Sequence, residues 1–250
     1  MTVRVAVFAS GGGTNLQALL DRFGGPMGPA GRVAEIVLVV SDREDAGALD
    51  RARAAAVPTR VIPVRGRAAD DVARETLEVL EAAEVELIAL AGYLRLVPTE
   101  VVRRYRGRIV NIHPSLLPAF GGKGMYGQRV HEAVLEAGCR VTGVTVHLVD
   151  EEYDTGPILA QWPVPVLEGD TPERLAARVL RTEHRLYPAV VETLAVELAR
   201  GKADATARPG AYAGPDPRCF TVDERDAPDA ESVRRALGLD GSRSGCREPY

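Results

Sequence analysis

The sequence Arg-Ile-Val-Asn-Ile-His-Pro-Ser-Leu-Leu-Pro occupies residues 108–118 and changes character at its centre. Its first half is apolar and β-branched, as in a buried strand, and its second half is a turn between prolines. Because side chains alternate along a strand, Asn111 and His113 point to the same side, at the strand's end. Pro114 disfavours helical backbone for His113 and keeps it extended. An amide donor beside a titratable imidazole suits oxyanion stabilisation and proton transfer, although a lone Asn-x-His is more often structural.

The composition is that of an ordinary globular protein, with 250 residues, 46% of them hydrophobic and 26% charged. The length allows one large or two small domains. A net charge of −4 argues against nucleic acid as the main partner. The three cysteines show no metal-ligand spacing and no disulfide framework, which predicts a reducing cytoplasm. We find neither a signal peptide nor an apolar run long enough to cross a membrane.

The first half of the chain alternates short apolar runs with helical patterns. The expected strands are 3–9, 33–40, 60–64, 87–91 and 109–112, and the expected helices between them are 16–23, 45–56, 68–83 and 99–105. This alternation predicts an α/β fold: a mainly parallel twisted sheet with helices on both faces, as in Rossmann-like proteins. Sites in such sheets lie at the carboxyl ends of strands, where residues 11–15 and His113 both fall.

The second half of the chain has a different pattern. A helix is expected at 126–137, and two strands at 141–149 and 157–166 are joined too closely for a helical crossover, so they should pair antiparallel. A long helix over 171–198 is expected to begin at a Thr171 cap and to be interrupted near Pro188. We therefore expect one domain over 1–200, with halves of about 1–110 and 111–200. Residues 201–250, rich in Gly, Pro, Asp and Arg, are expected to form a loosely structured tail.

A glycine-rich turn follows the first predicted strand. Gly11, Gly12 and Gly13 let the backbone approach an anion, and the next helix supplies free N–H groups at its start. Thr14 and Asn15 add side-chain donors. The turn lacks the Gly-Lys-Ser/Thr of a P-loop and the third glycine of a dinucleotide fingerprint. A phosphate cradle and a plain capped turn therefore remain equally good interpretations of this segment.

Further polar residues lie near the predicted strand ends. Asp154 follows the first of the two later strands, where its carboxylate would orient His113 and raise its pKa. Taken alone, Asp154 is also a plain turn residue, and His147, Glu183 and His131 have ordinary structural explanations. The histidines form no metal-binding motif, so no metal is expected.

Four motifs taken together resemble the phosphoribosylglycinamide formyltransferase family, the folate-dependent formyltransferases of purine biosynthesis. They are Gly-Gly-Gly-Thr-Asn-Leu-Gln-Ala at 11–18, Leu-Ala-Gly-Tyr-Leu-Arg at 90–95, Asn-Ile-His-Pro-Ser-Leu-Leu-Pro at 111–118 and Asp-Thr-Gly-Pro-Ile at 154–158. The third motif is shared by folate formyl-transfer enzymes as a group, and the first favours this member. The resemblance covers about residues 3–200. It fails at residues 119–127, where many relatives have a shorter turn that contains a histidine.

The resemblance implies roles for individual residues. Asn111, His113 and Asp154 match the catalytic residues of the family. The residues that match its glycinamide ribonucleotide site are Gly13, Thr14, Asn15 and Glu183. The residues that match its folate site are Arg67, Leu94, Arg95, Leu96, Val97, Asn111 and His147; the loop that contains Arg67 aligns loosely.

The resemblance also implies a reaction. A formyl group would pass from 10-formyltetrahydrofolate, the co-substrate, to the amine of glycinamide ribonucleotide in a cytoplasmic monomer or homodimer, with no metal, nucleic acid or membrane partner. Two enzymes with the same catalytic residues are alternatives. Formyltetrahydrofolate deformylase usually carries an N-terminal regulatory domain. Methionyl-tRNA formyltransferase needs a C-terminal RNA-binding domain. A non-catalytic nucleotide-binding module would explain the glycine loop but not the three catalytic matches together.

Overall fold

The computed structural model describes residues 2–25 and 32–201. In chain order, its strands and helices are β1 (Val3–Phe8), α1 (Thr14–Phe23), β2 (Ala34–Ser41), α2 (Gly47–Ala54), β3 (Thr59–Val61), α3 (Ala69–Ala82), β4 (Leu87–Leu90), α4 (Thr99–Arg104), β5 (Ile109–His113), α5 (Gln128–Glu136), β6 (Val141–Leu148), β7 (Ile158–Pro165) and α6 (Pro172–Ala199). The predicted tail over 201–250 lies outside the described residues, apart from Gly201.

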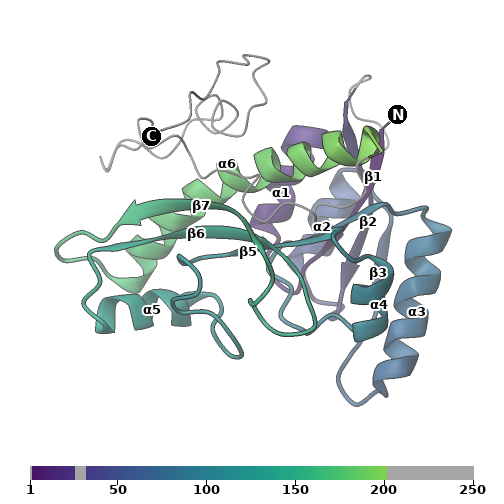
Figure 1. Cartoon of the computed structure of the whole chain (residues 1–250). Helices are drawn as coiled ribbons and strands as arrows, with labels where there is room; N and C mark the ends of the chain where they lie inside the picture. The colour runs from purple at the N-terminus through teal and green to yellow at the C-terminus, as the bar shows by residue number, and fades with distance from the viewer. Residues whose placement is uncertain (1, 26–31, 202–250) are drawn as a thin grey trace, which may run out of the picture.

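The strands form one seven-stranded sheet in the order β3-β2-β1-β4-β5-β6-β7. The first five strands in chain order pair in parallel, while β6 runs antiparallel to β5 and to β7. The predicted fold class is therefore confirmed, including the antiparallel strands of the second half. The order places β5 between β4 and β6, and β4 separates it from β1 (Figure 1).

Helices cover both faces of the sheet and bury two apolar clusters. One cluster joins the sheet to α1, α2 and α6, and the other joins it to α3 and α4. In Figure 1, α6 crosses one side of the sheet and α3 lies on the opposite side. Strands buried on both faces explain the near-continuous apolar runs in the sequence.

The prediction that α6 is interrupted near Pro188 is wrong, since the helix is continuous from Pro172 to Ala199. Proline inside a helix costs about 3 kcal/mol, because it removes one backbone hydrogen bond. Leu186, Tyr187 and Val190 are almost completely buried around it. Each buried apolar side chain contributes about 1.5–3 kcal/mol, which offsets the cost. The predicted cap is confirmed, because Thr171 Oγ1 accepts from Arg174 N–H (3.3 Å).

No helix within residues 2–25 and 32–201 combines the length and the apolar character needed to cross a bilayer.

Candidate active site

The glycine-rich turn joins β1 to α1 and opens the helix end toward the cavity described below. Gly13 has a φ of 73°, and a Cβ there would lie 2.7 Å from Ala48 Cα, so only glycine fits. The first hydrogen bond into α1 runs from Gln17 N–H to Gly13 O (2.9 Å). The N–H groups of residues 14–16 therefore have no partner within the helix and are available to an anion.

A buried acid from the far end of the chain meets this turn. Glu183 on α6 is 7% exposed, and its Oε2 accepts from Asn15 Nδ2 (2.6 Å). Burial raises the pKa of Glu183, while the hydrogen bond from Asn15 opposes that shift. Both side chains line the same cavity. The alternative interpretation of Glu183 as a solvated surface charge is wrong, because α6 packs this face against α1.

The end of β5 holds the predicted catalytic cluster. Asn111 and His113 project from this strand, and Asp154 reaches them from the β6–β7 connection. Asp154 Oδ2 lies 3.6 Å from His113 Nδ1, and Asp154 Oδ1 lies 3.4 Å from Asn111 Nδ2. Gly122 N–H donates to Asp154 Oδ2 (2.9 Å). Asp154 holds this position with a φ of 57°, in the left-handed region that Asp and Asn tolerate best among non-glycine residues.

His147 completes the cluster from β6, where it pairs in register with Asn111. Its Nδ1 lies 2.8 Å from Leu148 O, so in the neutral ring Nδ1 carries the hydrogen. Its Nε2 then accepts from Asn111 Nδ2 (3.1 Å). This contact fixes the amide of Asn111 with its nitrogen toward Asp154. His147 is 2% exposed, and the contacts that it makes orient Asn111.

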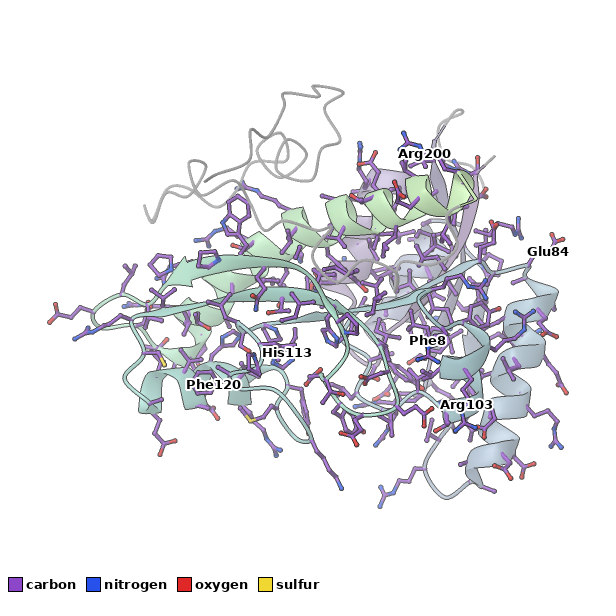
Figure 2. All side chains as sticks on the ribbon, in the orientation of Figure 1. Phe8, Glu84, Arg103, His113, Phe120 and Arg200 are labelled. Atoms are coloured by element: carbon purple, nitrogen blue, oxygen red, sulfur yellow. The ribbon has the colours of Figure 1, made fainter. Side chains whose placement is uncertain are left out.

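His113 lies between two acceptors. Its Nε2 lies 2.8 Å from the carbonyl oxygen of Phe120, and both residues are labelled in Figure 2. Its Nδ1 faces Asp154. Burial lowers the pKa of His113, and the opposing effects of Asp154 and the Phe120 carbonyl do not restore it. The prediction that Asp154 raises the pKa of His113 is therefore right for the contact with Asp154 alone. It is wrong for the net pKa, which burial lowers. The imidazole is neutral at pH 7, with its hydrogen on Nε2.

Asp154 is ionised at neutral pH. Burial raises its pKa, but the contacts with His147, His113 and Gly122 N–H outweigh burial and bring the pKa below its usual range. A neutral imidazole beside a carboxylate is poised to gain a proton, because only the imidazolium can donate to Phe120 O and to Asp154 together.

The segment after β4 carries the predicted folate residues. Leu94 and Leu96 are 40% and 41% exposed, which is unusual for large apolar side chains and leaves them free to contact a ligand. Leu94 N–H donates to the buried hydroxyl of Ser10 (2.9 Å), which ties this segment to the glycine turn. Arg95 Nε pairs with the buried Asp42 (2.7 Å). Val97 packs into the apolar core and also lines the cavity.

One open cavity of about 810 Å³ connects these parts. Of the residues predicted for the site, it is lined by Thr14, Asn15, Leu94, Arg95, Leu96, Val97, Asn111, His113, His147, Asp154 and Glu183. Two predicted residues do not line it. Gly13 belongs to the glycine-rich turn but packs against Ala48. Arg67 pairs with Glu75 on α3 (2.6 Å). The structure therefore gives Arg67 no contact with this cavity.

Several lining residues were not predicted. The glycine-rich segment 122–127 covers part of the cavity, and Tyr93, Tyr153 and Leu180 contribute apolar surface. His131 on α5 also lines it, although the sequence favours a structural role for this histidine. The only sequence signal for this position would have been the helical periodicity of α5, which sets the side of the helix on which His131 lies.

His131 should make the protein sensitive to acid. It is 4% exposed, and burial, assisted by the nearby His113, lowers its pKa from 6.5 to about 4. Because the pKa is lower in the folded than in the unfolded state, His131 favours folding above pH 6.5. This contribution is lost as the pH falls toward 4, and the difference is about 3 kcal/mol at ~1.4 kcal/mol per pKa unit. We expect the loss of unfolding free energy between pH 7 and pH 4.5, measured in urea, to be smaller in His131→Gln than in the wild type. Equal losses would contradict this assignment.

Among residues 2–25 and 32–201, no group of three or more His, Cys, Asp or Glu side chains is placed to hold a metal ion.

A family model described as formyl transferase matches residues 3–191. The chain therefore belongs to the formyl transferase family, and it is a formyltransferase. It is 46% identical over 203 residues to a chloroplastic phosphoribosylglycinamide formyltransferase of Arabidopsis thaliana, covering 80% of this chain and 68% of the relative. It is 41% identical over 194 residues to the phosphoribosylglycinamide formyltransferase of Bacillus subtilis strain 168, covering 76% of this chain and 94% of the relative.

Solved structures agree with these sequence relatives. The crystal structure of phosphoribosylglycinamide formyltransferase from Brucella melitensis superposes with a TM-score of 0.69 at 45% identity, covering 78% of this chain and 96% of that one. Some relatives are much longer, and the chain spans 18% of the trifunctional purine biosynthetic protein adenosine-3 of Bos taurus. The resemblance inferred from the four motifs is confirmed.

Proposed function

We propose that this formyltransferase moves the formyl group of 10-formyltetrahydrofolate to the amine of glycinamide ribonucleotide, within purine biosynthesis. The observation that carries the proposal is the single cavity that joins the glycine turn and Glu183 to the Asn111, His113 and Asp154 cluster. Relatives named phosphoribosylglycinamide formyltransferase support it from both plants and bacteria. We further propose that the activity resides in residues 1–200 and that the enzyme works in the cytoplasm without a metal.

The proposed substrates fit the two ends of the cavity. The phosphate of the ribonucleotide would accept from the free N–H groups at the start of α1, where the helix end also supplies positive potential. The folate would lie over the exposed Leu94 and Leu96, whose side chains can pack against the flat faces of its aromatic rings. The amine and the formyl carbon would then meet beside Asn111 and His113, because these side chains line the same cavity.

The residues of the cluster suit addition and elimination at the formyl carbon. The amine attacks this carbon, and the formyl oxygen becomes an oxyanion. The contact from Asn111 Nδ2 to Asp154 is 3.4 Å, at the long end of the hydrogen-bond range, so this N–H can turn to the oxyanion. The other N–H stays on His147.

His113 then handles the proton. It is neutral before reaction, so its Nδ1 can accept the proton that the attacking amine loses, directly or through water. Asp154 stabilises the resulting imidazolium. The proton passes next to the folate nitrogen as the bond from that nitrogen to the formyl carbon breaks. The products are the formylated ribonucleotide and tetrahydrofolate, and no covalent bond to the enzyme forms.

An absorbance assay of folate deformylation tests the proposal. We would mix the full chain with 10-formyltetrahydrofolate, with and without glycinamide ribonucleotide. Turnover that requires the ribonucleotide supports the transferase. Turnover without it indicates the deformylase reaction, and turnover only with methionyl-tRNA indicates the tRNA formyltransferase; either result rejects the proposal.

Glu183→Gln should weaken binding of the ribonucleotide. The amide keeps the volume and can still accept from Asn15, but it puts an N–H donor where a carboxyl oxygen could accept from a substrate hydroxyl or amine. A hydrogen bond to a charged group contributes about 1.5–3 kcal/mol, so we expect KM for the ribonucleotide to rise about 10- to 100-fold. KM for the folate should stay unchanged. Glu192→Gln is the matched control, since Glu192 lies on the same helix and pairs with Arg22 on α1. An unchanged KM for the ribonucleotide in Glu183→Gln would remove Glu183 from its site.

A further inference from the structure

Thr145 is a buried residue of β6 whose contacts reach the catalytic histidine without touching the cavity. It is 0% exposed and pairs in register with His113 across the antiparallel β5–β6 ladder. Its hydroxyl donates to Ser115 O (2.7 Å) and accepts from Leu117 N–H (2.9 Å). A hydroxyl with one donated and one accepted bond to the same turn fixes that turn in one position.

Gln161 on β7 reinforces the same turn. Its Nε2 donates to Thr145 Oγ1 (3.0 Å) and to Leu117 O (2.8 Å). Within the turn, Ser115 Oγ donates to Ala119 O (2.6 Å). These bonds connect the two antiparallel strands to the backbone that leads from Pro114 to Phe120.

The end of this turn holds the catalytic pair. The carbonyl of Phe120 lies 2.8 Å from His113 Nε2, and two residues later Gly122 N–H donates to Asp154 (2.9 Å). Phe120 adopts a φ of 55°, which is unfavourable for a residue of its kind and persists only where neighbouring contacts enforce it. The turn therefore determines which nitrogen of His113 carries the hydrogen and where Asp154 lies.

We propose that Thr145, supported by Gln161, is a positioning residue for formyl transfer that holds the 114–120 turn and so fixes the tautomer and orientation of His113. The proposal rests on the proposed function for its kinetic test, and on the structure alone for its spectroscopic test. Thr145 does not touch substrate, since it does not line the cavity.

Thr145→Val and Thr145→Ser distinguish the effect of the hydroxyl group from the effect of the side chain's shape. Valine keeps the shape but leaves Leu117 N–H without its acceptor, whereas serine keeps the hydroxyl. Because small misplacements of catalytic groups can cost about 100-fold, we expect kcat of Thr145→Val to fall about 10- to 100-fold. KM for both substrates should stay within about twofold of the wild type. Thr145→Ser should recover most of kcat.

Two further readouts distinguish positioning from general damage. Loss of the Phe120 carbonyl removes an interaction that raises the pKa of His113, so the acid limb of the pH–rate profile should move to lower pH in Thr145→Val. Asp154, His147 and His131, the titratable groups around His113, are left in place. Long-range proton–nitrogen spectra of the imidazole should show the hydrogen on Nε2 in the wild type and a mixture of tautomers in Thr145→Val.

Thr142→Val is the matched control. Thr142 lies on the same strand and is 3% exposed, but its hydroxyl has no partner among the described residues. Its replacement should leave kcat, the pH profile and the spectra unchanged. If Thr145→Val does not fold, Gln161→Leu should show smaller changes in the same directions.

Wild-type kcat and tautomer in Thr145→Val would overturn the proposal. So would a fall in kcat with an unchanged tautomer and pH profile, because that result indicates loosened packing. If the wild type transfers no formyl group, the proposed function fails, and the spectra still decide whether Thr145 fixes His113.

Discussion

Asp154→Asn is expected to reduce kcat about 1,000-fold while leaving KM for both proposed substrates within about threefold of the wild type. The carboxylate faces His113, His147 and Asn111 at 3.6, 3.5 and 3.4 Å. An amide there cannot compensate an imidazolium and can point an N–H at a neighbouring donor. Asparagine tolerates the left-handed backbone at this position, so the turn should keep its shape. Steady-state kinetics by absorbance measures both constants.

Asp150→Asn is the matched control for this variant. Asp150 lies in the same connection and accepts from Thr155 Oγ1 (2.8 Å), but it does not line the cavity. Its kinetics should match the wild type, with at most a small loss of stability. The assignment of Asp154 would be wrong if kcat of Asp154→Asn lay within about tenfold of the wild type.

Part of the proposed catalytic cluster was predictable because strand geometry is encoded locally. Alternation along a strand placed Asn111 and His113 on one side, and the short link between two later strands required an antiparallel return. The separate pairing of β6 with β5 places His147 beside Asn111, and the β6–β7 connection carries Asp154 at the same strand end. Strand geometry therefore predicted the Asn111 and His113 pair, whereas Asp154 and His147, up to 43 positions away from it, were assigned from the family resemblance, because each alone has an ordinary structural explanation.

Properties that depend on burial could not be predicted. The direction of the shift in the pKa of His113 depends on whether the effect of burial exceeds the effect of Asp154. The local sequence does not show how deeply the imidazole is buried. The same holds for His131, whose position in the cavity depends on how α5 packs. Arg67 was placed by a loose alignment, and its contact with Glu75 depends on the approach of α3.

The residues that position the cluster were missed for a related reason. Thr145 and Gln161 are ordinary strand residues in the sequence, and only the three-dimensional pairing of β6 and β7 shows that both reach the turn after His113. Side chains that act through other side chains leave no motif. Asn111 is the opposite case, since the role proposed for it follows directly from its place at the strand end.

Asn111→Ala should therefore show the second large effect. If Asn111 Nδ2 donates to the developing oxyanion, its removal costs about 3–4 kcal/mol of barrier, or about 100- to 1,000-fold in kcat, with little change in either KM. Asn111→Asp distinguishes the effect of the N–H donor from the effect of the side chain's volume. It restores the size, but it replaces the donor with a charged acceptor beside Asp154. Its kcat should therefore be no higher than that of Asn111→Ala.

A kcat of Asn111→Ala close to that of the wild type would exclude the amide from oxyanion stabilisation. Recovery of kcat in Asn111→Asp would show instead that filling the space beside His147 is what matters.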